Sequence, residues 1–149
     1  MIDEVRDVLD DLLTNVPGVV GTILLDIDGI PISLSGRFDL PPEELGALLA
    51  ACFGSYVQLG NDLGQELSTI ITEYNDLKLY QIGMARGALV IIASKEAYLG
   101  MIRMEAKRAI GQLSTIMTAT QNARKKMMDE HKFRAPSQEE IHDVITKFI

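Results

Sequence analysis

The sequence predicts an α+β fold whose elements follow in the order helix, two-strand hairpin, helix, three antiparallel strands, helix. Asp28-Gly29 stands between two alternating apolar runs, a pattern typical of a two-residue type I′ hairpin turn. Three more strand-like runs follow later in the chain, joined by links short enough for hairpins. Apolar residues at helical spacing fill the segments before, between and after the strands.

The segment from Met1 to Asn15 is predicted to form an amphipathic helix. Acidic residues alternate there with an apolar stripe at i, i+3, i+4 and i+7 spacing, and Pro17-Gly18 ends the helix. The stripe consists of Ile2, Val5, Val8, Leu9, Leu12 and Leu13.

The hairpin that runs from Gly21 to Gly36 has a register that follows from its pattern. With one isoleucine on each side of the turn, one face carries the apolar pairs Ile27–Ile30, Leu25–Ile32 and Ile23–Leu34. The other face carries Asp26–Pro31, Leu24–Ser33 and Thr22–Ser35. The nitrogen of Pro31 then points away from the first strand, so the second strand is expected at an edge of the sheet.

A second helix is expected over Pro42 to Asp62, because proline and two acidic residues open it. The helix is apolar nearly all round, so it needs cover on more than one side, and another subunit is the natural second cover. Its small-residue stripe from Gly46 to Ser55 suits close backbone approach, either to that subunit or to the chain's own sheet. Cys52, the single cysteine, excludes an internal disulfide and is expected to be buried within this helix.

The three later strands are predicted over Glu66–Tyr74, Lys78–Met84 and Ala88–Ser94. The last is apolar on both faces and is expected in the middle of the sheet, whereas the mixed composition of the first suits an edge. Ser94 is expected to cap a third helix with an apolar side. That side consists of Leu99, Ile102, Ala106, Ala109, Ile110, Leu113, Ile116 and Met117.

The character of the chain changes after about Thr120, which predicts a domain over 1–120 and an extension over 121–149. The extension begins as a charged linker, breaks at Pro136 and continues with a capping box at Ser137. A short amphipathic helix follows, and it must dock either on its own domain or on a partner. Its apolar stripe consists of Ile141, Val144, Ile145 and Phe148.

Composition excludes several classes of function. The net charge of −7 and the isoelectric point near 4.8 argue against binding to a nucleic-acid backbone. The longest apolar run, Ala88–Ala93, is too short to span a bilayer, and the chain opens without a signal peptide, so a cytoplasmic location is expected. His131 and His142 are too poorly accompanied to suggest zinc. We predict neither a cofactor nor a metal.

The hairpin motif also allows an enzymatic interpretation. An apolar strand running into Asp-x-Asp-Gly resembles the nucleophile motif of haloacid-dehalogenase phosphatases, with Asp26 as nucleophile and Asp28 as general acid. That motif continues with Thr or Val, whereas Ile30 and a second strand follow here. No convincing acidic pair for magnesium follows downstream, so a magnesium-dependent phosphatase is only a remote alternative.

The order of elements, together with VPGVVGTILLDIDGIPISLSG (Val16 to Gly36), the small-rich second helix and ALVIIAS, resembles a Roadblock (dynein light-chain) domain. The resemblance covers about Met1 to Thr120. It implies a five-stranded antiparallel sheet with the first and third helices on one face and the second on the other. It further implies dimers in which the third strands pair edge to edge and the second helices meet.

The resemblance also implies a role as a scaffold or regulator of small Ras-like GTPases, as in the bacterial polarity protein that activates its partner GTPase. A purely structural adaptor, such as a subunit of a motor or signalling complex, stays open beside it. The sequence has no Gly-x-x-x-x-Gly-Lys loop, so the chain itself should not hydrolyse GTP. We therefore predict a non-enzymatic protein.

The predicted contact residues fall into two groups. The predicted homodimer interface comprises Ala47, Leu48, Ala51, Gly54, Ser55, Thr69, Ile71 and Glu73. Predicted partner contacts are Arg37 and Arg86, either of which could serve as an arginine finger, and the tail residues Ile141, Val144, Ile145 and Phe148.

Overall fold

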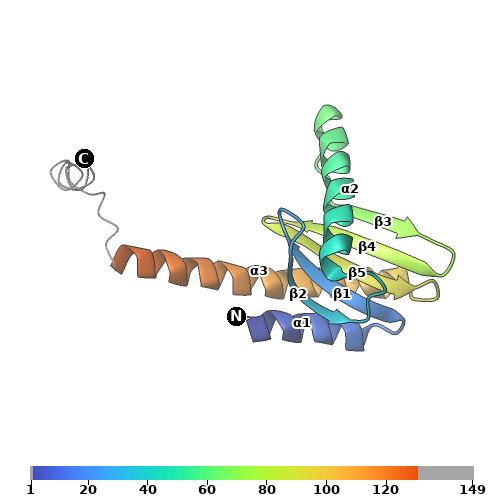
Figure 1. The fold of residues 1–149 in the computed structure, drawn as a ribbon, viewed down its shortest axis with the longest axis horizontal. Helices are drawn as coiled ribbons and strands as arrows, with labels where there is room; N and C mark the ends of the chain where they lie inside the picture. The colour runs from blue at the N-terminus through green and yellow to red at the C-terminus, as the bar shows by residue number, and fades with distance from the viewer. Residues whose placement is uncertain (1, 131–149) are drawn as a thin grey trace, which may run out of the picture. The chain divides into compact units, whose positions relative to one another are not determined.

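The structure of the chain, a computed structural model, describes residues 2–130 (Figure 1). Five strands form one antiparallel sheet in the order β2-β1-β5-β4-β3, with three helices beside it, so the predicted α+β fold is confirmed. The elements are α1 (Ile2–Asn15), β1 (Val19–Asp26), β2 (Pro31–Gly36), α2 (Pro42–Asp62), β3 (Thr69–Glu73), β4 (Leu77–Met84), β5 (Gly87–Ser94) and α3 (Leu99–Glu130).

The strand positions follow from the composition of each strand. β5 occupies the middle of the sheet as predicted, and its Leu89, Val90 and Ile91 are fully buried because both faces of the sheet are covered there. β2, which begins with Pro31, lies at one edge, and β3 lies at the other. Both edge assignments made from the sequence are therefore confirmed.

Helices cover the two faces of the sheet unequally. On one face, α2 packs Leu49 against a core of Ile23, Leu25, Val90 and Ile92. On the other face, the hydroxyl of Thr22 in β1 donates a 3.1 Å hydrogen bond to the carbonyl oxygen of Leu9 in α1. The part of α3 up to Ile116 lies beside α1, with which it shares a groove. The side chains that α1 and α3 bury most completely include Val5, Leu9, Leu12, Ile102, Ala106 and Leu113.

The β1–β2 hairpin departs from the predicted register near its turn. Thr22↔Ser35, Ile23↔Leu34 and Leu24↔Ser33 pair as predicted, but a bulge then places Leu25 opposite Pro31 instead of Ile32. The predicted two-residue turn is wrong, because the loop consists of three residues that end in Gly29 with a positive φ of 81°.

The carboxylate of Asp26 is the physical reason for this longer loop. Its Oδ1 accepts hydrogen bonds from the backbone N–H groups of Asp28 and Ile30, both at 2.9 Å. The carbonyl oxygen of Asp26 also accepts from the N–H of Gly29 at 3.0 Å, which closes the turn. The predicted Ile27–Ile30 pair does not form, and these two side chains are 78% and 59% exposed.

Three further expectations need correction or extension. Ser94 does not cap α3, because the helix begins only at Leu99, and Ser94 instead ends β5, where its N–H donates to the carbonyl oxygen of Gly18 at 2.7 Å. Cys52 is exposed on α2 instead of buried, since little of that helix faces the core. α3 continues to Glu130, so the first part of the expected charged linker is helical. The predicted helix after Pro136 lies outside the described residues.

Contacts divide the chain into two compact units, Met1–Ile116 and Met117–Ile149, and this boundary lies within α3. The first unit contains the whole sheet, α1, α2 and the first part of α3.

Candidate functional site

The outer edge of β3 presents backbone groups that have no partner strand among residues 2–130. At the two ends of the β3–β4 ladder, Tyr74 N–H donates to the Leu77 carbonyl at 2.8 Å and Gly83 N–H donates to the Ser68 carbonyl at 3.2 Å. Hydrogen-bonded and non-hydrogen-bonded pairs alternate along an antiparallel ladder. The residues that point their N–H and C=O groups away from β4 are therefore Thr69, Ile71 and Glu73. These three residues are the ones predicted for the dimer interface on this strand.

α2 crosses the sheet toward this free edge. Near its start, Gly46 lies against Gly29 of the hairpin loop, and further along Phe53 lies over Gly83 of β4. Only Gly46 and Leu49 are fully buried in the helix, and Figure 1 shows the second half of α2 extending past the sheet. The helix is therefore covered on one side of its first half and is open over the rest.

The open part of α2 carries a stripe of exposed side chains, here called the α2 stripe. Its members recur at i, i+4, i+8, i+11 and i+15, the spacing of one helix face. They are Leu48, Cys52, Tyr56, Leu59 and Leu63, the last of which caps the helix. Of these five residues only Leu48 belongs to the predicted dimer interface, although their spacing is visible in the sequence.

The other predicted helix residues lie next to the α2 stripe. Ala47, Ala51, Gly54 and Ser55 are all exposed. The two glycines at the ends of the small-residue stripe differ in their surroundings. A Cβ atom on Gly46 would lie 2.2 Å from the carbonyl oxygen of Gly29, whereas one on Gly54 would meet nothing within 4 Å. Close packing within the chain thus explains Gly46, and Gly54 faces open space.

An apolar groove of about 350 Å³ lies beside the first turns of α2, at the end of the sheet where β4 begins. The predicted contact residue Arg37 lines it, and its backbone N–H donates to the Val20 carbonyl at 2.9 Å. Arg86 lies in the β4–β5 turn, at the opposite end of the strands, so the structure does not bring the two arginines together. The apolar lining of the groove consists of Val20, Phe38, Leu40, Leu45, Leu77, Leu79 and Ile92.

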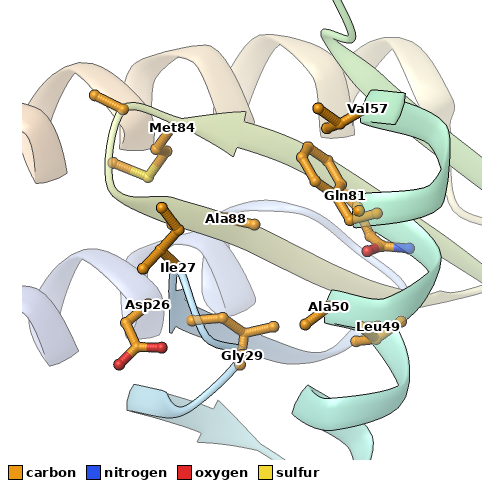
Figure 2. A pocket seen from close by; sticks show the side chains of 14 residues that line it. Asp26, Ile27, Gly29, Leu49, Ala50, Val57, Gln81, Met84 and Ala88 are labelled. Atoms are coloured by element: carbon orange, nitrogen blue, oxygen red, sulfur yellow. The ribbon is translucent and has the colours of Figure 1, made fainter. Parts of the chain in front are cut away.

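A second cavity, of about 330 Å³, lies on the other side of α2, between the helix and the tips of the β1–β2 and β4–β5 hairpins (Figure 2). Its walls are mostly apolar, and Gln81 of β4 is the buried polar side chain that lines it. Asp26 stands at the hairpin side of this cavity. The bonds that Asp26 accepts from Asp28 and Ile30 assign its carboxylate a role in the turn, which differs from the role of an attacking nucleophile.

The described residues hold no group of three or more His, Cys, Asp or Glu side chains arranged to bind a metal ion. Within the same part of the chain, no helix combines the length and the apolar character that crossing a membrane requires.

Comparison with known proteins agrees with this architecture. The sequence pattern of the Roadblock/LC7 domain matches residues 6–99. The chain belongs to the Roadblock/LC7 family. An uncharacterized protein of Methanocaldococcus jannaschii is 26% identical over 105 residues, which cover 70% of this chain and 89% of that relative. The Ragulator complex protein LAMTOR3-A of Xenopus laevis is 26% identical over 114 residues, which cover 76% of this chain and 92% of the relative.

Among solved structures, MglB of Myxococcus xanthus has a similar fold. It superposes with a TM-score of 0.74 at 24% identity, over 79% of this chain and 90% of that one. At this identity the likeness concerns the fold.

Proposed function

We propose that this Roadblock/LC7 protein is a non-enzymatic homodimer in the cytoplasm that binds a small Ras-like GTPase and modulates its GTP hydrolysis. Family membership supports a regulatory or adaptor role. The observation that carries the proposal is the pairing of an open strand edge with the exposed α2 stripe, because both are suited to contact with another protein.

The geometry of β3 and α2 supports the proposed dimer. A two-fold axis at Ile71 would place Ile71 opposite its copy and Thr69 opposite Glu73 of the partner protomer. The outward N–H and C=O groups would then form about six backbone hydrogen bonds across the axis. Such a contact closes on itself, so it forms a dimer and no fibre.

In a dimer with this axis, the α2 stripe would also contact the partner protomer. α2 crosses its own sheet near the start of β3, since Phe53 lies over Gly83. The two-fold operation exchanges the start of one β3 with the end of the other, so the overhanging half of α2 would reach the partner's groove at Leu77 and Leu79. Burying the stripe there removes its exposed leucines from water, each contributing roughly 1.5–3 kcal/mol when fully buried.

The GTPase would be held by residues that belong neither to β3 nor to the α2 stripe. Arg37 and Arg86 are exposed at opposite ends of the strands, where either could enter the active site of a bound GTPase. The tail residues Ile141, Val144, Ile145 and Phe148, which lie outside the described residues, are proposed to add a helix that docks in a groove of the GTPase.

A structural adaptor without GTPase contact is the second candidate function. The observation that favours it is the similarity to LAMTOR3-A, whose name makes it a subunit of the Ragulator complex. An adaptor of this kind would use the same surfaces to hold other subunits together.

A pull-down with the small Ras-like GTPases of the organism, each loaded with GDP or with a GTP analogue, separates the two functions. Retention of a GTPase that depends on its nucleotide, together with a changed rate of GTP hydrolysis, supports the regulator. If no GTPase is retained in either state while other subunits co-purify stoichiometrically, the adaptor function is supported instead.

A further inference from the structure

The cavity between α2 and the hairpin tips has no role in the dimer proposed above. Ala50, Gly54 and Val57 of α2 line it, and these residues lie on the side of the helix that faces away from the groove lined by Leu45. A second copy that covers the α2 stripe would therefore leave this cavity open on each protomer. The cavity is therefore a candidate binding site that is separate from the dimer contact.

The interior of the cavity combines apolar walls with one polar anchor. Leu25, Leu49 and Ala88 are buried in its walls, and Gln81 is only 3% exposed (Figure 2). Among residues 2–130 no hydrogen bond is given for the Gln81 side-chain amide, and no side-chain nitrogen or oxygen there is both fully buried and unpaired, so the amide is accessible from the cavity that it lines. An amide in an apolar site gains free energy from a partner that both donates and accepts a hydrogen bond. A peptide group offers both.

The rim of the cavity points to a protein instead of a small molecule. Ile27 lines the mouth and is 78% exposed, and Ile30 at the same hairpin tip is 59% exposed. A molecule small enough to enter a cavity of about 330 Å³ would leave both isoleucines in water. A polypeptide segment crossing the hairpin tip would cover them while it inserts one side chain.

The charge of the rim selects among such segments. Asp26 ends β1 and Asp28 lies in the hairpin loop, whereas Arg86 is the charged residue of the β4–β5 turn on the facing side, so two carboxylates stand against one guanidinium at this rim. The chain as a whole carries a net charge of −7. Lysine or arginine beside the inserted residue would therefore complement the rim.

We propose that this cavity receives one aliphatic side chain from an extended segment of a partner protein, with the adjoining peptide group bonded to the Gln81 amide and a flanking basic residue beside Asp26 and Asp28. The site does not depend on the partner being a GTPase, so it stands apart from the function proposed above.

The experiment titrates the isotope-labelled full-length chain with the capped peptide Ac-Lys-Leu-Lys-NHMe at millimolar concentration and follows NMR shifts. We expect shifts at the side-chain amide of Gln81 and at the methyl groups of Ala50 and Ala88. The matched peptide Ac-Glu-Leu-Glu-NHMe should bind at least threefold more weakly. Gln81→Leu, which keeps the volume, should weaken binding of the lysine peptide about three- to tenfold, the effect of one lost hydrogen bond.

Asp28→Asn provides a second variant at an exposed position, and it should reduce the difference between the two peptides without changing the shifts at Ala88. Absence of shifts around the cavity with the lysine peptide would overturn the proposal. Equal binding of both peptides and of the neutral compound N-isobutylacetamide would also overturn it, because the site would then recognise any small amide and no partner segment.

Discussion

The substitutions Gly46→Ala and Gly54→Ala provide a matched test of how α2 is packed. Both glycines lie in the same helix, so each substitution gains roughly 1 kcal/mol of helix propensity. Their surroundings differ, because a Cβ atom on Gly46 would lie 2.2 Å from the Gly29 carbonyl oxygen and 3.1 Å from a methyl group of Leu25. At Gly54 the new methyl group would have no neighbour within 4 Å among the described residues.

The expected effects therefore have opposite signs. Gly54→Ala should raise the free energy of unfolding by about 1 kcal/mol. Gly46→Ala forces the hairpin loop to move, and this loop is held by the two hydrogen bonds to Asp26 and by Gly29 at a φ of 81°. Overpacking of this kind costs about 1–3 kcal/mol, and the close approach to backbone places the cost at the upper end, so the net loss is about 2 kcal/mol.

Urea unfolding of both variants at one protein concentration measures the difference, which should be about 3 kcal/mol with an unchanged m-value. Equal stabilisation by the two alanines would refute the packing of α2 against the hairpin. A loss of dimer in Gly54→Ala alone, with the chain still folded, would instead place Gly54 in the subunit contact.

Three further outcomes follow from the structure. Asp26→Ala should lower the free energy of unfolding, measured in urea, by about 1–3 kcal/mol because two hydrogen bonds are lost, and Asp26→Asn should lower it less. Magnesium-dependent hydrolysis of a phosphate ester that is abolished in Asp26→Asn would contradict the role of Asp26 in the turn. Leu59→Arg and Ile71→Pro should each sediment as monomers at micromolar concentration, the first by burying an unpaired charge and the second by removing an outward N–H, while the α3 variant Gln112→Arg stays dimeric. Deletion of 135–149 should leave sedimentation and the melting temperature unchanged but weaken GTPase binding by about 1–3 kcal/mol; a melting temperature lowered by several degrees with binding intact would place the tail in the core.

The fold could be predicted from sequence because its main signals are redundant. β5 is apolar on both faces, which permits only a central position, and Pro31 cannot donate to a neighbouring strand, which requires an edge. The proline and the two acidic residues that open the second helix marked its start, and the predicted range Pro42–Asp62 agrees with the observed bounds. Each of these inferences depends on backbone conformation and hydrogen bonding or on the burial of apolar side chains. Both constrain many residues at once.

The errors arose where one side chain decides a local conformation. Asp-Gly predicted a two-residue turn, but the carboxylate of Asp26 captures two N–H groups and lengthens the loop. Cys52 was expected to be buried as a small hydrophobic residue within a helix, yet it is exposed on a side of α2 that no described residue covers. Sequence composition cannot tell which apolar side of a helix faces its own sheet.

The same difficulty affected the candidate site. Thr69, Ile71 and Glu73 were predicted as contacts of the edge strand, and their N–H and C=O groups point away from β4. The small residues of α2 received more weight than the leucines at Leu59 and Leu63, because the path of the helix past the sheet is a tertiary property. The buried amide of Gln81 could not be recognised at all, since its place in a strand says nothing of the cavity above it.

Calorimetric titration of the full-length dimer with each small Ras-like GTPase of its organism, loaded in turn with GDP and with a non-hydrolysable GTP analogue, tests the proposed function most directly. We predict that at least one GTPase binds with a dissociation constant that depends on the nucleotide, and that the monomeric variant Leu59→Arg binds it at least tenfold more weakly, about 1.4 kcal/mol. A chain that sediments as a dimer and binds no GTPase in either nucleotide state would contradict the proposed function.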